Sequence, residues 1–255
     1  EDRPLNHGWP WRREPSSPPA IFAHRGLAVD RFENTIGAFE AAIAAGADGV
    51  EIDVSMTRDG RLVCFHDPDL VRVTGIKEPL RSKTFAEIRS FPLEGKERIP
   101  TLDEALDVMG PEVPMIIDMK PSGRTDLGLP TALLRTLRRR RIDASSAITV
   151  SSFDWLHLRI MARRAPDLRT GFLVARDTVG SRVGMIRLKS APYAAIHPAR
   201  AMVDPDRVAR WHAAGLDVGT WVVNEPDEAR RVADAGADYV VTDSPAPIAA
   251  VLRSG

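Results

Sequence analysis

Residues 45–53 read AGADGVEID, and residues 235–243 read AGADYVVTD. Both stretches follow an Ala-rich helical segment, and in each the glycine is placed to end that helix in the left-handed conformation. A short apolar strand then follows and ends in an aspartate. Two copies of one helix–glycine–strand unit indicate an α/β fold with a parallel sheet, either a closed barrel or a doubly wound sheet.

Short apolar runs alternate with helical segments along the rest of the chain, as is typical of parallel strands covered on both faces. Nine such runs exceed the eight strands of a (β/α)8 barrel by one. The turn Asp59-Gly60 marks the run that follows it as an extra hairpin strand. We therefore predict a TIM barrel with a small insertion at about residues 67–100, which contains one helical piece near residues 84–90. The nine runs cover residues 21–23, 49–54, 62–65, 115–119, 148–153, 171–175, 194–197, 218–223 and 239–242.

The length of 255 residues suits one barrel domain, which we place at residues 20–255 behind an extended, Pro-rich arm at residues 1–19. The formal net charge is zero, which argues against nucleic acid as a partner. The sequence contains no transmembrane segment, and its single cysteine, Cys64, excludes an intramolecular disulfide. We expect a cytoplasmic location, although a chain that starts at Glu1 leaves a removed signal or anchor open.

Carboxylates gather where the predicted parallel strands end, which is the edge at which barrel active sites form. Glu51 and Asp53 are two residues apart in one strand, so both side chains face the barrel interior if Ile52 faces the helices. Asp118 ends the next barrel strand. Three buried carboxylates need compensation, and a hard divalent cation supplies it. Pairing with Arg or Lys at the rim is the alternative, and we favour a site for Mg²⁺ or Ca²⁺.

Two histidines, His24 and His66, follow strands at the same edge. Two imidazoles beside carboxylates can divide the work of general base and general acid. Arg25 and Lys120 would hold an anionic phosphoryl group between them. The sequence therefore predicts phosphodiester hydrolysis, and we expect His24 as the base and His66 as the acid. The other histidines, for which we expect structural roles or solvent exposure, are His7, His157, His197 and His212.

The ordered motifs of the chain resemble those of the glycerophosphodiester phosphodiesterase family over nearly everything after residue 20. The resemblance implies a (β/α)8 barrel with an insertion after the His-Asp motif, and cleavage of glycerophosphodiesters to an alcohol and glycerol 3-phosphate. The matching motifs are His24-Arg25-Gly26, Glu33-Asn34-Thr35, Glu51 with Asp53, Thr57-Arg58-Asp59-Gly60, His66-Asp67, Ile99 to Glu104, Ser151 to Asp154, Trp221 to Asn224 and Thr242 to Pro245.

The resemblance also assigns individual roles. It implies acid–base catalysis by the two histidines, metal binding by Glu51 and Asp53, and phosphate binding by Arg25 and Lys120. Asp118 departs from the family, which usually has Glu there. An Asp is one methylene shorter, so the cation would lie closer to this strand or bind through a water.

Three predicted site residues keep an alternative. Glu33 resembles a further rim acid, but it could equally be a residue at a helix start beside a capping Asn34 or Thr35. Phe153 and Trp221 would form apolar walls for the glycerol or alcohol group, and plain barrel packing is their alternative.

Two other functions stay open. Asp118 and the short insertion would suit a lysophospholipase D-like phosphodiesterase, because a more open pocket admits the acyl chain of a lysolipid. A non-catalytic barrel that binds phosphodiesters or scaffolds a partner is the second. In each case the ligand is a small-molecule or lipid-derived phosphodiester, whose alcohol group the sequence does not identify.

Overall fold

The computed structural model describes residues 11–14, 16–29, 31–75, 77–93, 97–110, 113–122, 126–143, 147–175 and 193–254. His7 and most of the predicted N-terminal arm lie outside the described residues. Within the described part of the chain, no helix is both long enough and apolar enough to cross a membrane.

Eight parallel strands form a closed barrel, because β1 pairs with β2 on one side and with β9 on the other. The remaining strand, β3, runs antiparallel to β2. This arrangement confirms the (β/α)8 fold and identifies the run near residue 62 as the extra hairpin strand. The strands are β1 Ala20–His24, β2 Gly49–Met56, β3 Leu62–Cys64, β4 Met115–Met119, β5 Ile148–Ser152, β6 Thr170–Val174, β7 Ala195–Pro198, β8 Asp217–Thr220 and β9 Tyr239–Thr242.

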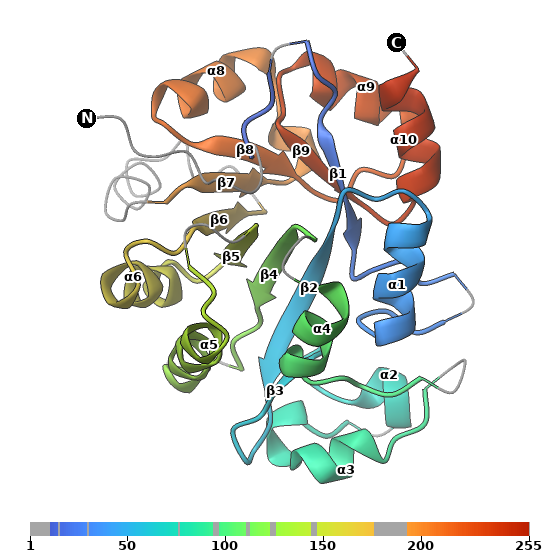
Figure 1. Cartoon of the computed structure of the whole chain (residues 1–255), viewed down its shortest axis with the longest axis vertical. Helices are drawn as coiled ribbons and strands as arrows, with labels where there is room; N and C mark the ends of the chain where they lie inside the picture. Colours follow the sequence, from blue (N-terminus) through green and yellow to red (C-terminus); the bar gives the residue numbers. More distant parts are fainter. Residues whose placement is uncertain are drawn as a thin grey trace.

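Helices surround the barrel strands, and Figure 1 shows α2 and α3 set apart from this ring, next to β3. The basic run at residues 138–141 ends α5, where Arg139 pairs with Asp103 of α4. The helices are α1 Ile36–Ala44, α2 Val71–Thr74, η1 Leu80–Ser82, α3 Phe85–Arg89, α4 Leu102–Met109, α5 Gly128–Arg139, α6 Trp155–Arg164, η3 Arg200–Met202, α8 Pro205–Ala213, α9 Pro226–Asp234 and α10 Pro245–Arg253.

In both copies of the AGAD segment, the aspartate side chain accepts a hydrogen bond from the backbone of a neighbouring strand. Asp48 stands one residue before β2, and its Oδ2 accepts a hydrogen bond of 2.8 Å from the Ile21 backbone N–H of the neighbouring strand β1. Asp238 stands one residue before β9, and its Oδ2 accepts a hydrogen bond of 2.7 Å from the Val218 N–H of β8. Each aspartate therefore joins the start of its own strand to the strand beside it.

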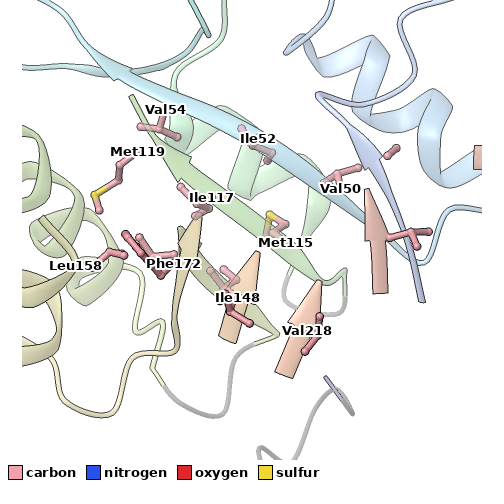
Figure 2. Packing of buried hydrophobic residues seen from close by; sticks show 14 of the residues in the cluster. Val50, Ile52, Val54, Met115, Ile117, Met119, Ile148, Leu158, Phe172 and Val218 are labelled. Carbon is pink, nitrogen blue, oxygen red and sulfur yellow. The ribbon is translucent and has the colours of Figure 1, made fainter. Parts of the chain in front are cut away.

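The main core lies between the barrel strands and the helices, and Figure 2 shows part of it. Val50, Ile52 and Val54 point outward from β2 into this layer, and all three are fully buried. Since side chains alternate along a strand, Glu51 and Asp53 point to the barrel interior, as the sequence predicts.

A second cluster fills the barrel interior below the site. Trp11 stacks on Phe22 at a centroid distance of 5.5 Å, and both pack with Ile116 and Tyr239. The ring of Tyr239 has room only because β8 carries a glycine opposite. A Cβ on Gly219 would lie 1.9 Å from Tyr239 Cε2. The described part of the arm thus contributes Trp11 to the base of the barrel.

The insertion after β3 has a small apolar core of its own, which includes Leu70, Leu80 and Ile88. Its helix α3 begins at a capping box, in which Thr84 accepts from the Glu87 N–H and the Glu87 side chain accepts from the Thr84 N–H. This packing makes the insertion an ordered layer beside the mouth of the barrel.

Candidate active site

A cavity of about 290 Å³ opens where the barrel strands end. It brings together side chains from β1, β2 and β4 and from the loops that follow β3, β5 and β8. Asp53 lies beneath its surface with 1% exposure, and Glu33 lies behind Arg25. The lining includes eight residues that the sequence predicts for the site, namely His24, Arg25, Glu51, His66, Asp118, Lys120, Phe153 and Trp221.

Three carboxylates converge at the base of this cavity. Ligand oxygens of Glu51, Asp53 and Asp118 lie within 4.8 Å of one another, and all three residues are buried. Burial and the charge of Asp53 raise the pKa of Glu51 to about 8, and burial raises the pKa of Asp118 to about 6. The three acids therefore do not all ionise at neutral pH unless a metal cation binds between them.

The donor set fits a hard divalent cation. The Asp118 Oδ1 atom is buried, and within the described part of the chain it has no hydrogen-bond partner. Mg²⁺ and Ca²⁺ prefer carboxylate oxygens as ligands, and this unpaired oxygen is available to bind one. Asp118 Oδ2, by contrast, is in contact with the Lys120 ammonium group.

Asp53 is the most strongly anchored of the three acids. Asn34 holds it twice, since Asn34 Nδ2 donates to Asp53 Oδ2 at 2.8 Å and Asn34 Oδ1 accepts from the Asp53 N–H at 3.0 Å. Lys120 Nζ lies 3.0 Å from Asp53 Oδ1, and Arg25 Nε lies 2.9 Å from Oδ2. Burial opposes ionisation of Asp53, but the two cations outweigh it and lower the pKa of this carboxyl. The pairing with Arg and Lys that we considered as an alternative is thus present at this acid.

The turn after β1 aims Arg25 into the site. Arg25 and Gly26 both have left-handed backbones, with φ values of 57° and 80°. A Cβ on Gly26 would lie 2.6 Å from the Ala38 backbone, so only glycine fits this close approach. The Arg25 N–H donates to Glu51 Oε2 at 3.1 Å, which ties the turn to the acidic cluster.

His24 is oriented by an acid from the opposite end of the chain. Its Nδ1 lies 2.7 Å from Asp243 Oδ1, and Asn224 Nδ2 donates to Asp243 Oδ2 at 2.7 Å. Burial disfavours the charged imidazolium, but the bond to Asp243 and the nearby Glu51 outweigh burial and raise the pKa of His24. Because Nδ1 is engaged, Nε2 is the ring atom available for chemistry.

His66 has a matching arrangement. Its Nδ1 lies 2.8 Å from Asp67 Oδ1, and Asp67 Oδ2 accepts from Arg72 Nε at 2.7 Å. Arg72 Nη2 also donates to Glu33 Oε1 at 2.6 Å, and the same oxygen accepts from Arg25 Nη1 at 2.8 Å. A continuous series of contacts between acidic and basic side chains therefore runs from His66 through Arg72 of the insertion helix α2 to Arg25.

These contacts bear on both interpretations of Glu33. Thr35 is the N-cap of α1, because its side chain accepts from the Ala38 N–H. Glu33 lies two residues before this cap and also links Arg25 to Arg72, so its place agrees with a residue beside a helix start and with a rim acid. The sequence prediction missed the roles of Asn34, Asp67, Arg72 and Asp243, although all but Arg72 lie in the quoted motifs.

Two aromatic rings form one wall of the cavity. Phe153 and Trp221 meet edge to face at a centroid distance of 5.5 Å, and Phe153 is 47% exposed. Lys120 Nζ lies 5.9 Å from the Phe153 centroid. The wall is thus open on one side to solvent and borders the charged groups on the other.

The floor of the cavity includes His197. Its Nδ1 lies 2.9 Å from Ser151 Oγ, and its Nε2 lies 2.7 Å from the Tyr239 hydroxyl. Burial and Arg169 lower the pKa of His197 to about 3, so the ring stays neutral. A Cβ on Gly171 would lie 2.6 Å from this ring, which explains the glycine in β6. Of the other histidines, His157 is fully buried in α6 and His212 pairs with Asp238.

Comparison with known proteins gives the same family. Residues 24–246 match the model of the glycerophosphoryl diester phosphodiesterase family. The glycerophosphodiester phosphodiesterase of Caldanaerobacter subterraneus subsp. tengcongensis is 29% identical over 243 residues, which cover 92% of this chain and 98% of that protein.

Solved structures agree with this match. A protein from Silicibacter pomeroyi DSS-3, described as a glycerophosphoryl diester phosphodiesterase, has a TM-score of 0.85 and 29% identity, with 96% of each chain covered. A phosphodiesterase from Oleispira antarctica, solved with its product sn-glycerol-3-phosphate, has a TM-score of 0.84 and 26% identity, with 92% of this chain and 97% of that chain covered. The family match spans most of the chain, so the enzyme class predicted from the motifs, a phosphoric diester hydrolase, is confirmed. The chain belongs to the glycerophosphoryl diester phosphodiesterase family.

Proposed function

We propose that this protein hydrolyses glycerophosphodiesters to an alcohol and glycerol 3-phosphate with one divalent cation, Mg²⁺ or Ca²⁺, and two catalytic histidines. The observation that carries the proposal is the cavity that both imidazoles line together with Glu51 and Asp118, with Asp53 of the acidic trio beneath its surface. The product bound to the Oleispira antarctica phosphodiesterase supports the choice of substrate class.

Substrate binding divides between charge and apolar contact. Arg25 and Lys120 lie on the cavity wall beside the carboxylates and hold the anionic phosphoryl group. Phe153 and Trp221 provide an apolar face for the carbon backbone of the glycerol. Glu51, Asp53 and Asp118 would hold the cation, which would supply Lewis-acid stabilisation of the phosphoryl group.

The two histidines move the protons. His24 Nε2 accepts a proton from the attacking oxygen, which forms a new bond to phosphorus and belongs to water or to the glycerol hydroxyl of the substrate. Attack by the hydroxyl gives a cyclic phosphate, which water then opens to glycerol 3-phosphate. The ester bond between phosphorus and the alcohol oxygen breaks, and His66 Nε2 donates the proton that this oxygen needs to leave. Asp243 and Asp67 fix the two rings through Nδ1, so each Nε2 faces the reacting group.

Release of glycerol 3-phosphate from glycerophosphodiesters in the presence of Mg²⁺ or Ca²⁺ tests the proposal. The variants His24→Ala and His66→Ala should each lose at least about 100-fold in kcat, and chelation should abolish turnover. Undiminished turnover in either variant would refute its catalytic role.

A lysophospholipase D-like activity is the second candidate. Phe153, which lines the cavity, is 47% exposed, and Leu127 and Leu156, at the starts of α5 and α6, are 49% and 36% exposed. Such apolar side chains could receive the acyl chain of a lysolipid. Phosphorus NMR of a lysolipid digest distinguishes this activity, because it must yield a cyclic or open phosphomonoester. The non-catalytic barrel, the remaining alternative from the sequence, is not supported, because the family match identifies the chain as a phosphoric diester hydrolase.

A further inference from the structure

A second cavity, of about 240 Å³, adjoins the first and shares part of its wall. His66 and Lys120 belong to the walls of both cavities. The remaining described lining comes from the end of β2, from the insertion and from the loop after β4. These residues are Ser55, Met56, Asp67, Pro68, Leu80, Arg81, Pro121 and Ser122.

The shared residues determine how a diester can bind. A phosphodiester has two ester arms on one phosphorus atom, and the phosphoryl group is held beside Lys120 under the proposed function. One arm then extends into the cavity with the aromatic wall, and the other extends past His66 into the second cavity. Because His66 stands at the entrance to this second cavity, the arm in it is the one that receives the proton from His66 and leaves.

Arg81 gives this second cavity its chemical character. Its Nη1 donates to Ser122 Oγ at 2.8 Å and forms an ion pair with the buried Asp126. Both contacts use Nη1, so they fix the guanidinium plane while the N–H groups on Nε and Nη2 can donate to a ligand. The side chain is 40% exposed, which leaves it accessible from the cavity.

The charge of the lining favours hydroxyl groups over a quaternary ammonium group. Arg81, Lys120 and Asp67 are the charged groups that surround His66 in the lining, and each is paired with a neighbouring opposite charge. The described lining therefore offers N–H donors to hydroxyl groups but no unpaired carboxylate to a quaternary ammonium group. Quaternary ammonium groups are recognised in proteins by aromatic cages. Among the described lining residues there is no aromatic side chain apart from the imidazole of His66.

We infer that the second cavity is the binding site for the leaving alcohol, and that it selects a polyol such as glycerol over choline. The polyol hydroxyls accept hydrogen bonds from Arg81. When the phosphorus–oxygen bond breaks, its electron pair stays on the alcohol oxygen, and the proton from His66 Nε2 completes the neutral alcohol. The inference rests on the proposed function, since it assigns the second arm of the same substrate.

The test compares kcat/KM for glycerophosphoglycerol and glycerophosphocholine in the wild-type holoenzyme and in two variants. Arg81→Met combined with Asp126→Asn removes the cation and its buried partner together, so that no buried charge is left unpaired. Arg58→Met is the matched control. Arg58 also contacts the η1 segment, through the Ser82 carbonyl oxygen at 3.0 Å, but it belongs to the described lining of neither cavity.

The expected result is a wild-type preference for glycerophosphoglycerol of at least about tenfold, which corresponds to one good hydrogen bond to a charged group. The double variant should reduce this ratio about tenfold, and the control should leave it unchanged. Equal or better cleavage of glycerophosphocholine by the wild type, or an unchanged ratio in the double variant, would overturn the inference while leaving the proposed function intact. No cleavage of either diester would overturn both.

Discussion

Each of the two histidines proposed for catalysis is paired with one carboxylate through Nδ1. Asp243 binds His24 Nδ1 at 2.7 Å and Asp67 binds His66 Nδ1 at 2.8 Å. This pairing fixes the ring orientation and stabilises the imidazolium that forms when the ring holds a proton. Under the proposed mechanism, the two acids tune the proton chemistry while the acidic trio binds the cation.

Replacing Asp243 should move the pH dependence of the enzyme. The hydrogen bond from His24 helps to hold the pKa of His24 above its ordinary value, so Asp243→Asn should lower that pKa. Since His24 acts as a base only after losing its proton, the acidic limb of the kcat/KM profile should move down by about one pH unit.

The same variant should lower kcat by about tenfold or more, because the ring loses its preferred orientation. Asp227→Asn is a suitable control, since Asp227 is 98% exposed and pairs only with Arg230 among the described contacts. An acidic limb that stays in place or moves up in Asp243→Asn would contradict the assigned role of His24.

Cation binding should be pH-dependent because Glu51 must give up a proton. Burial and Asp53 raise the pKa of Glu51 to about 8, so the cation-free side chain is protonated at pH 7. The affinity for Ca²⁺ should therefore rise up to about tenfold per pH unit between pH 6 and 8. Titration calorimetry of the apoenzyme in buffers of different ionisation enthalpy measures both the affinity and the released proton. The Glu51→Gln variant should bind Ca²⁺ weakly and without this proton release. A Ca²⁺ affinity of the wild type that does not change with pH would contradict the assigned role of Glu51.

At the scale of elements, helix α2 of the insertion supports the catalytic site through Arg72. This side chain bridges Asp67 and Glu33 and lies over the Phe32 ring at 4.9 Å. The sequence could not reveal this bridge, because nothing in the local pattern around residue 72 distinguishes it from an ordinary exposed arginine.

Arg72→Ala should lower kcat about tenfold with little change in KM, because His66 loses the support of Asp67 while the phosphate contacts remain. Arg72→Lys should recover part of the loss, since an ammonium group can contact one acid but does not reproduce the planar fork. Val71→Ala, on the same helix at 44% exposure, serves as the control. An equal loss in both alanine variants would indicate a general effect of the insertion rather than positioning by Arg72.

Substitution of the two glycines in the repeated AGAD segment should separate the cost of backbone strain from the cost of side-chain packing. Gly46 has a φ of 83° and open space where a Cβ would stand, whereas Gly236 has a φ of 96° and Val208 Cγ1 would lie 3.2 Å from its Cβ. Gly46→Ala should lower the free energy of unfolding by about 1 kcal/mol, from backbone strain alone. Gly236→Ala should cost more, because Val208 must also move. Urea unfolding measures both, with Gly46→Asn as a milder substitution; equal stability of Gly46→Ala and wild type would argue against this account.

Most strands were predictable because burial on both faces leaves a continuous apolar run. The run at residues 115–119 matches β4 residue for residue, and residues 239–242 match β9. The run at 218–223 was too long, because β8 ends at Thr220 and Trp221 continues along the cavity wall. Apolar residues that line a site look the same in sequence as residues that fill a strand.

At the scale of the whole molecule, the contacts that the sequence could not predict are those made by barrel closure. His24 and Asp243 are 219 positions apart and meet because β1 pairs with β9. His197 reaches the cavity floor only because β6 has a glycine at the facing position. Periodicity identifies which residues face inward, but not which inward residues meet.

The N-terminal arm also makes a contact that the sequence did not predict. Its Pro-rich composition indicated an extended segment and left its role open. In the structure Trp11 is 3% exposed and stacks in the base of the barrel. This contact lies at the end of the barrel opposite the cavity, since its partner Tyr239 is the first residue of β9. Segments at both ends of the described chain therefore contribute to one closed structure.

The central claim is that one divalent cation and two imidazoles share a single phosphoryl group at the mouth of the barrel. A crystal structure of the enzyme with Ca²⁺ and glycerol 3-phosphate tests it most directly. We predict one Ca²⁺ bound by Glu51, Asp53 and Asp118, with phosphate oxygens within hydrogen-bond reach of Nε2 on both His24 and His66. A cation bound away from these carboxylates, or a phosphate that reaches only one of the two rings, would contradict the mechanism.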